Sequence, residues 1–231
     1  MNRNKQLPFI WQLSPRIPFT RLNIVCKEIR KITTEGTILD LGCGHGQSAQ
    51  FILSKVKGHY ILTGLDAFLP DIIQAKELDI YSNIVLYDLN KPFPFAEKTF
   101  DIVLLLEVLE HFPREDGERL LAKMEAIARK GVIISTPGFL DRTRIGTETE
   151  DTAYYMKRYK NEPLRMPHVT IWTEEDYRNF GYNVKRVNGI HIPRLPPLLN
   201  QVFGVFSAPF AYFFLTHMSE HFVAIKRTQA R

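Results

Sequence analysis

Three glycines stand at every second position after an acidic residue early in the chain. The residues are Asp40, Gly42, Gly44 and Gly46, and the apolar run 37–39 comes directly before them. Glycines in this place let a chain that leaves a buried strand turn tightly into a helix and bring bare backbone close to a ligand. The pattern therefore predicts a nucleotide-binding turn between a strand and a helix.

The spacing of these glycines separates two kinds of ligand. A dinucleotide-binding fingerprint reads G-x-G-x-x-G, and Gln47 stands where its third glycine belongs. Asp40 would lie where the pyrophosphate of such a ligand collects near the start of the helix, and a carboxylate repels that anion. The same carboxylate suits a ligand that carries an ammonium group and a sulfonium but no phosphate. This combination points to S-adenosylmethionine.

The glycine segment resembles the first motif of class I S-adenosylmethionine-dependent methyltransferases, close to the type 11 and type 12 groups. The resemblance extends over about residues 37–137. The apolar run 60–65 ends in Asp66, where an acid can accept hydrogen bonds from ribose hydroxyls. Another apolar run, 84–87, ends in Asp88. The remaining matches are residues 100–111, similar to the fourth motif, and residues 131–137, similar to the fifth strand.

The fold that this resemblance implies is α/β and Rossmann-like. It is a doubly wound, mostly parallel seven-stranded sheet with an antiparallel last strand and helices on both faces. The alternation of strand-like and helix-like segments along the chain agrees with it. We expect one domain over residues 1–231, with insertions at about 138–170 and 190–220. Helices are expected at residues 19–32, 45–56, 70–78 and 115–129, and the last two strands at 183–187 and 221–226.

The resemblance also implies which residues hold S-adenosylmethionine. The methionine part would lie against Asp40 and the glycine turn, and the ribose against Asp66. The adenine would lie beside Asp88 and Leu89. Glu107, at the end of the fourth strand, would lie under the methionine end. The full set implied as cofactor-binding is Asp40, Leu41, Gly42, Cys43, Gly44, Gly46, Asp66, Ala67, Asp88, Leu89 and Glu107.

A second constellation combines two acids and two histidines. Glu107, Glu110 and His111 form E-x-x-E-H, and His168 comes shortly before Trp172. Plant-type small-RNA 2′-O-methyltransferases have a similar set that holds a divalent ion. The same E-V-x-E-H occurs in family members without a metal, so we predict no metal site. We name His111 and His168 as candidate catalytic bases, with a structural role as the alternative.

Composition agrees with one folded domain in a reducing, cytoplasmic setting. The 231 residues are 45% hydrophobic and 24% charged, which excludes a disordered chain. Two cysteines give no disulfide framework, and no secretion signal is visible. The net charge is +5, and basic residues are concentrated in residues 1–31. That arm could face nucleic acid or a lipid surface, but a helix packed on the sheet is the favoured interpretation.

The two insertions bear on the acceptor. Residues 138–170 follow the fifth strand, so they can roof an acceptor pocket. Residues 190–220 are rich in aromatic side chains, and between Arg194 and Glu220 they contain no charged residue. Pro196, Pro197 and Pro209, within this uncharged stretch, argue against one membrane-spanning helix. We rank a core or pocket-wall role first, peripheral membrane contact second and a homodimer interface third.

These features predict methyl transfer to an oxygen of a small molecule or glycan, including one attached to a lipid. The alternative acceptor is RNA, methylated on oxygen with the help of a metal, although no RNA-binding module is recognisable. A non-catalytic partner subunit of the same fold is a third hypothesis. The intact acids and glycines of the turn argue against it.

Overall fold

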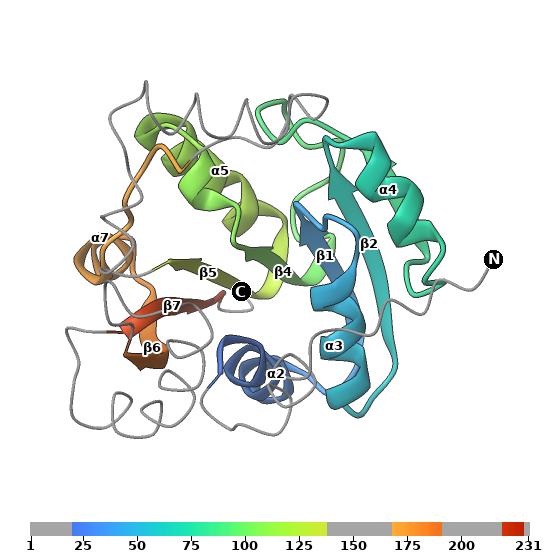
Figure 1. The fold of residues 1–231 in the computed structure, drawn as a ribbon, viewed down its shortest axis with the longest axis horizontal. Helices are drawn as coiled ribbons and strands as arrows, with labels where there is room; N and C mark the ends of the chain where they lie inside the picture. Colours follow the sequence, from blue (N-terminus) through green and yellow to red (C-terminus); the bar gives the residue numbers. More distant parts are fainter. Residues whose placement is uncertain (1–19, 138–167, 191–218, 229–231) are drawn as a thin grey trace.

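The computed structural model describes residues 20–137, 168–190 and 219–228 (Figure 1). They contain a seven-stranded sheet in the order β3-β2-β1-β4-β5-β7-β6. Strand β7 is antiparallel to both of its neighbours, and the pairs formed by β1 to β5 are parallel. The predicted fold class is therefore confirmed. The strands are β1 Gly36–Leu41, β2 Tyr60–Asp66, β3 Asn83–Leu86, β4 Phe100–Leu106, β5 Ala128–Pro137, β6 Asn183–Ile190 and β7 Ser219–Arg227.

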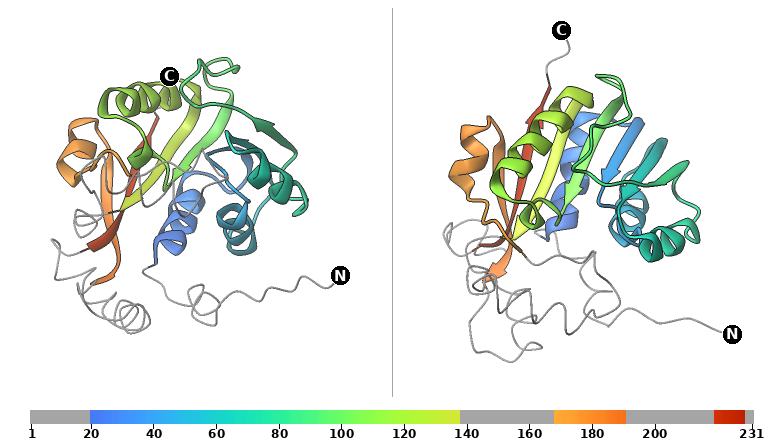
Figure 2. Two further views of the ribbon diagram at one scale, coloured as in Figure 1. Left: turned by 45° about the horizontal axis from the view of Figure 1, so that its top comes forward. Right: turned by 90° about the horizontal axis from the view of Figure 1, so that it is seen from above.

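Helices cover both faces of the sheet, with α2 and α3 on one side and α5 and α7 on the other (Figures 1 and 2). Neighbouring residues of one strand serve the two sides, because side chains alternate along a strand. Ile38 of β1 packs with α2 and α3, whereas Leu39 packs with α5 and α7. The helices are α2 Arg21–Ile32, α3 Gln47–Lys55, α4 Leu69–Lys76, α5 Arg114–Ile127 and α7 Glu174–Asn179, with a 3₁₀ turn η2 at Leu109–His111.

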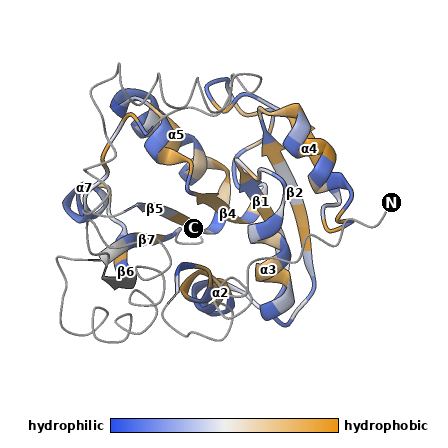
Figure 3. Ribbon diagram, in the orientation of Figure 1, coloured by the Kyte–Doolittle hydropathy of each residue, from blue (hydrophilic) through white to orange (hydrophobic). Residues whose placement is uncertain are grey.

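Helix α2 is the leading helix expected from the sequence. Val25, Cys26 and Ile29 are buried against the sheet, and α2 carries both hydrophobic and hydrophilic residues, as a helix with one buried side should (Figure 3). Arg30 and Lys31 lie in the last turn, where positive charge suits the helix dipole. The packing interpretation is thus confirmed for this part of the basic arm, and residues 1–19 lie outside the described residues.

Two details differ from the sequence-based expectations. Helix α5 ends at Ile127, so β5 begins at Ala128, three residues before the expected start. The short helix α7 was not expected, because six residues are too few to show helical periodicity. It is stabilised by a capping box in which the side chains and backbone N–H groups of Thr173 and Asp176 bind each other.

The predicted insertions lie almost entirely outside the described residues, which include only 168–170 of the first and residues 190, 219 and 220 of the second. Their roles remain predictions. In the part of the chain that the structure describes, no helix is both long enough and apolar enough to cross a membrane.

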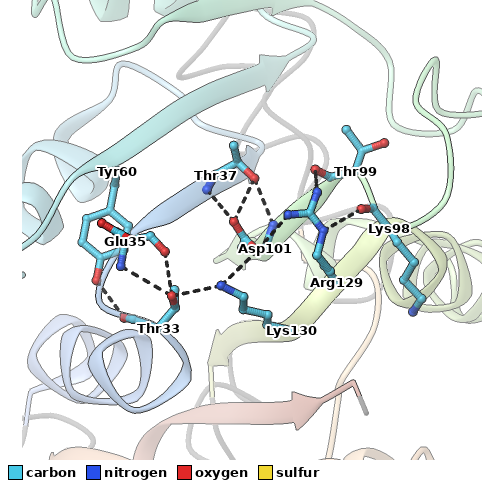
Figure 4. A network of polar contacts seen from close by, with 9 residues as sticks. All are labelled: Thr33, Glu35, Thr37, Tyr60, Lys98, Thr99, Asp101, Arg129 and Lys130. Atoms are coloured by element: carbon cyan, nitrogen blue, oxygen red, sulfur yellow. Dashed lines mark hydrogen bonds and ion pairs between the residues drawn. The ribbon is translucent and has the colours of Figure 1, made fainter. Parts of the chain in front are cut away.

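A buried carboxylate joins the amino ends of β1, β4 and β5 (Figure 4). Asp101 Oδ2 accepts a hydrogen bond from the Thr37 backbone N–H (2.9 Å), and Oδ1 lies 3.0 Å from Arg129 Nη1 and 3.2 Å from Lys130 Nζ. Burial alone would raise the pKa of Asp101, but the Thr37 hydrogen bond and the two cations lower it overall. A Cβ on Gly36 would lie 2.2 Å from Oδ2, so only glycine leaves room for the carboxylate.

We predict that Asp101→Asn lowers the free energy of unfolding at pH 7 by about 1 to 3 kcal/mol, because two cations lose a charged partner. The loss stays below that of a fully buried pair, since Arg129 and Lys130 are half-exposed. The lowered pKa means that the carboxylate stabilises the fold at neutral pH and that this contribution disappears as the pH falls.

Urea unfolding at pH 7 and pH 3 measures the effect, and Glu115→Gln on the exposed face of α5 is the control, with an expected change of less than about 0.5 kcal/mol. Equal stability of Asp101→Asn and the control at pH 7 would contradict the prediction.

Candidate functional site

The glycine turn connects the carboxyl end of β1 to α3. Gly42, Gly44 and Gly46 have φ angles of 66°, 52° and 80°, in the left-handed region that favours glycine. The backbone N–H groups of Gly42 and Cys43 donate to the Leu65 carbonyl at the end of β2 (2.8 and 3.1 Å). The turn is therefore fixed between two strand ends, at the edge of the sheet where α/β proteins bind ligands.

The three glycines differ in what surrounds them. A Cβ on Gly42 would lie 2.4 Å from Val108 Cγ2, and one on Gly46 would lie 2.8 Å from Leu78 Cδ1. Both positions are thus filled by the protein itself. A Cβ on Gly44 would lie 3.6 Å from Asp71 Oδ2, its nearest neighbour among the described residues. Gly44 is accordingly the glycine at which the turn leaves most room for a ligand.

Asp66 ends β2 and supports the turn from the side. Its Oδ2 accepts a hydrogen bond from the Gly44 N–H, and its Oδ1 accepts one from the Phe68 N–H, both at 2.8 Å. Each carboxylate oxygen has a second lone pair. Asp66 can therefore accept hydrogen bonds from two ribose hydroxyls without giving up the bonds that hold it in place.

Asp40 is buried, with 3% of its surface exposed, and accepts a hydrogen bond from the Tyr81 hydroxyl (2.7 Å). Burial raises the pKa of Asp40 to about 6, the Tyr81 bond opposes this, and the nearby Asp66 charge adds to it. The folded state therefore binds the proton of the Asp40 carboxyl more tightly than the unfolded chain does. As the pH rises from about 4 to 6, ionisation of Asp40 lowers the free energy of unfolding. Tyr81 lies between α4 and β3, and no sequence signal linked it to Asp40.

The surroundings of the turn are strongly negative. Burial raises the pKa of the Cys43 thiol well above its usual value, and the charges of Asp40, Asp66 and Asp71 raise it further. The thiol is therefore neutral. Three carboxylates around one turn disfavour a pyrophosphate and favour a ligand with positive charge.

The adenine-side candidates lie in the loop after β3. Leu89 is buried, while the Asp88 side chain is bonded to Asn90, whose backbone N–H and side-chain amide both donate to Oδ1 (2.9 and 3.0 Å). Lys123 of α5 holds this loop, because its Nζ donates to the Leu89 carbonyl (2.6 Å) and the Lys91 carbonyl (3.1 Å).

Two of the cofactor-binding candidates, Leu41 and Ala67, offer a ligand no polar side-chain contact. The Leu41 side chain is completely buried in the core, so only its backbone could face a ligand. Ala67, which directly follows Asp66, is partly buried, and its short side chain brings no polar group.

Glu107 directly follows β4 and has a φ of 59°, unusual for a residue with a side chain. Its Oε1 lies 2.9 Å from Arg21 Nη1 and accepts a hydrogen bond from the Ser135 hydroxyl (2.9 Å), and its Oε2 lies 3.0 Å from His221 Nε2. Burial acts to raise the pKa of Glu107, but the charges of Arg21 and His221 prevail and hold it well below its usual value. The side chain is a carboxylate at neutral pH.

Sequence reasoning missed all three partners of Glu107. His221 lies near the start of β7, opposite Pro137 at the carboxyl end of β5. An antiparallel last strand brings its first residues to the ligand edge, so the predicted topology could have revealed His221. Arg21 begins α2 and had been grouped with the general basic arm.

The structure brings together three members of the E-x-x-E-H and histidine set. Glu110, His111 and His168 each offer a ligand atom, and these atoms lie within 4.8 Å of one another. The centroids of the His111 and His168 rings are 5.0 Å apart, and His168 Nε2 lies 4.0 Å from Glu110 Oε1. The Val169 and Thr170 N–H groups donate to the Glu110 carbonyl and fix the segment that carries His168. Glu107 pairs with Arg21 and His221 instead of joining this group.

Comparison with known proteins agrees with this arrangement. Residues 38–131 match the family model described as a methyltransferase domain. No curated protein matches the chain. Several solved structures share its fold over most of its length, at identities that show the fold alone.

Three of these structures are methyltransferases or come from a complex with a methyltransferase activator. Magnesium protoporphyrin IX methyltransferase from Synechocystis PCC 6803, with bound SAM, is 15% identical, with a TM-score of 0.54, and covers 97% of this chain and 86% of its own. Plantazolicin methyltransferase BpumL, in complex with SAH, is 18% identical, with a TM-score of 0.53, and covers 98% and 87%. The protein bound to the Haloferax volcanii methyltransferase activator Trm112 is 14% identical, with a TM-score of 0.56, and covers 94% and 92%.

If Asp40 faces the ammonium group of S-adenosylhomocysteine, as the family resemblance implies, its raised pKa predicts an affinity that depends on pH. Below pH 6 a proton competes for the carboxylate, so the dissociation constant should rise by up to about tenfold per pH unit. Titration calorimetry between pH 8 and pH 5 measures this. Asp40→Asn should bind more weakly and lose the pH dependence, and a constant affinity of the wild type across this range would contradict the prediction.

The four-residue metal set suggested by the sequence is not assembled, because Glu107 pairs with Arg21 and His221, and this predicts no bound metal at the other three members. The ligand atoms of Glu110, His111 and His168 lie within 4.8 Å of one another, which makes a direct test worthwhile. Excess chelator or added Mn²⁺ should shift the melting temperature by less than about 1 °C. A rise of several degrees with Mn²⁺ in the wild type, absent in His168→Gln, would show that this cluster holds an ion.

Proposed function

We propose that this chain, whose residues 38–131 match a methyltransferase domain, transfers the methyl group of S-adenosylmethionine to a hydroxyl oxygen of a small molecule or glycan. The acceptor class includes glycans attached to a lipid. The observation that carries the proposal is the pair His111 and His168 beside the buried Glu110, just after β4.

The paired histidines favour an oxygen acceptor because of what the reaction requires. A sulfonium already activates its own methyl group, so transfer is a direct displacement that needs an aligned nucleophile and little else. A hydroxyl is a weak nucleophile until it loses its proton. A neutral amine is already a good nucleophile and needs no base. An imidazole near a buried carboxylate can take that proton, and the carboxylate stabilises the resulting imidazolium. We assign this role to His168, with His111 beside it.

The cofactor contacts are part of the same proposal. Asp40 and the glycine turn would hold the methionine part with Glu107, Asp66 would bind the ribose, and the loop at Asp88 and Leu89 would enclose the adenine. The hydrogen bonds of Asp66 and the negative surroundings of the turn support these assignments.

A metal-assisted RNA O-methyltransferase is the second candidate, because Glu110, His111 and His168 do form a group of metal-ligating types. The base is favoured over the ion because Glu107, the fourth member of the set, pairs with Arg21 and His221 instead. A non-catalytic partner subunit of the same fold is the third candidate, and the intact acids and glycines of the turn argue against it.

The test is transfer of a labelled methyl group from S-adenosylmethionine to lysate fractions separated into lipid, glycan, RNA and protein. We expect label in the glycan or lipid fraction, and none with Gly44→Val, which strains the turn and fills the space beside it. His168→Gln should lower the rate by about 10²- to 10⁴-fold with unchanged cofactor affinity. Label in RNA alone would favour the second candidate, and cofactor binding without any transfer would favour the third.

A further inference from the structure

A segment that begins with His168, residues 168–173, lies along the 3₁₀ turn η2 and binds its backbone. It donates hydrogen bonds to the two residues on either side of His111. The Val169 and Thr170 backbone N–H groups donate to the Glu110 carbonyl (2.8 and 3.1 Å), and the Thr170 hydroxyl donates to the Phe112 carbonyl (2.7 Å). The segment is therefore fixed beside the residue whose ring lies next to that of His168.

Trp172 anchors the other end of this segment. It is buried, with 1% of its surface exposed, and its Nε1 donates to the Leu109 carbonyl at the start of η2 (3.3 Å). The Arg114 guanidinium lies 4.5 Å from the centroid of the Trp172 ring, and the Tyr177 ring stacks on it with centroids 5.9 Å apart. A Cβ on Gly117 would lie 2.5 Å from Trp172 Cζ2, so the indole packs tightly against α5. The core therefore fixes Trp172 without the help of a ligand.

The contact between His168 and Glu110 does not by itself orient the imidazole. His168 Nε2 lies 4.0 Å from Glu110 Oε1, which is longer than a hydrogen bond. At this distance the carboxylate can stabilise an imidazolium through its charge, but such an attraction has no strict direction. Direction matters for proton transfer, because a base must lie within hydrogen-bond reach of the proton that it removes. The orientation of His168 therefore depends on the position of the backbone that carries it.

We propose that Thr170 and Trp172 are positioning residues for methyl transfer. They hold the backbone that carries His168 against η2, and so keep the imidazole beside the acceptor. The acceptor oxygen forms its bond to the methyl carbon, the bond from that carbon to sulfur breaks with its electrons going to sulfur, and His168 takes the hydroxyl proton. The side-chain donors of Thr170 and Trp172 are bound to backbone carbonyls, so the two residues act through His168. This inference rests on the proposed role of His168 as the base.

The test uses Thr170→Val, which keeps the shape of the side chain but removes the hydroxyl. With ring centroids 5.0 Å apart, NMR of the wild type should show a nuclear Overhauser effect between the ring protons of His111 and His168. Thr170→Val should abolish this effect. It should also lower the rate of labelled-methyl transfer, to the lysate fraction that the wild type labels, by about 10- to 100-fold, with the affinity for S-adenosylhomocysteine changed by less than about twofold. Thr170→Ser keeps a hydroxyl and should restore both the ring contact and the rate.

Thr173→Val is the matched control, because it removes the hydroxyl of a second threonine in the same segment. That hydroxyl caps α7 by accepting a hydrogen bond from the Asp176 N–H (3.1 Å). Thr173→Val should lower the melting temperature by about 2 to 4 °C and leave the ring contact and the transfer rate unchanged. If Thr170→Val behaves in the same way, less stable but with the ring contact and the rate intact, its role is structural and the proposal is overturned.

Two further variants complete the test. Trp172→Phe keeps an aromatic ring but loses the Nε1 donor, so the same loss of ring contact and rate is required, also if Thr170→Val does not fold. An unchanged rate in His168→Gln would overturn the base assignment and this inference with it, whereas a slow His168→Gln beside an unaffected Thr170→Val would overturn the positioning role alone. If the wild type labels no fraction, the ring contact decides: its loss in Thr170→Val but not in Thr173→Val supports the proposal, and its retention overturns it.

Discussion

The site depends on one costly arrangement, a carboxylate buried near the carboxyl end of β1. Asp40 has been removed from water and receives a hydrogen bond from Tyr81, which only partly offsets the loss of hydration, so its pKa rises to about 6. A core residue with this cost would be replaceable by an apolar one. Its cost is understandable if the site is completed by a positively charged ligand, and the neighbouring Asp66 and Asp71 act in the same direction.

The remaining parts of the site are brought to Asp40 by topology. Parallel strands β1, β2 and β4 end at one edge, which places the glycine turn, Asp66 and Glu107 together. The reversed direction of β7 adds His221 to this edge, and α2 adds Arg21 from the start of the described chain. Glu107 meets both and keeps a left-handed backbone conformation, with its N–H bound to the Ser135 carbonyl. Strain at a position with so many partners is typical of a functional residue.

How much of this could be predicted from the sequence depended on distance along the chain. Asp40, Gly44 and Asp66 carry local signals, because acids and glycines at strand ends form recognisable motifs, and the topology followed from the family resemblance that these motifs carry. Tyr81 and Arg21 gave no such signal, since their roles arise only when distant segments fold together. The E-x-x-E-H motif suggested one four-residue group. Its first acid instead pairs with Arg21 and His221, because Glu107 directly follows β4 whereas Glu110 lies in the 3₁₀ turn η2.

The two ends of the sheet treat buried carboxylates in opposite ways, and the contrast separates stability from function. At the amino ends, Asp101 is surrounded by Arg129, Lys130 and a backbone donor, which together lower its pKa and leave no role for a ligand. At the carboxyl ends, Asp40 has a raised pKa and a single neutral side-chain donor among its described contacts. At the amino ends, Arg129 and Lys130 permanently neutralise the Asp101 carboxylate. At the carboxyl ends, Asp40 gains a positive partner only when a ligand binds. Binding there should therefore select a cation and offset the destabilisation that comes from burying Asp40.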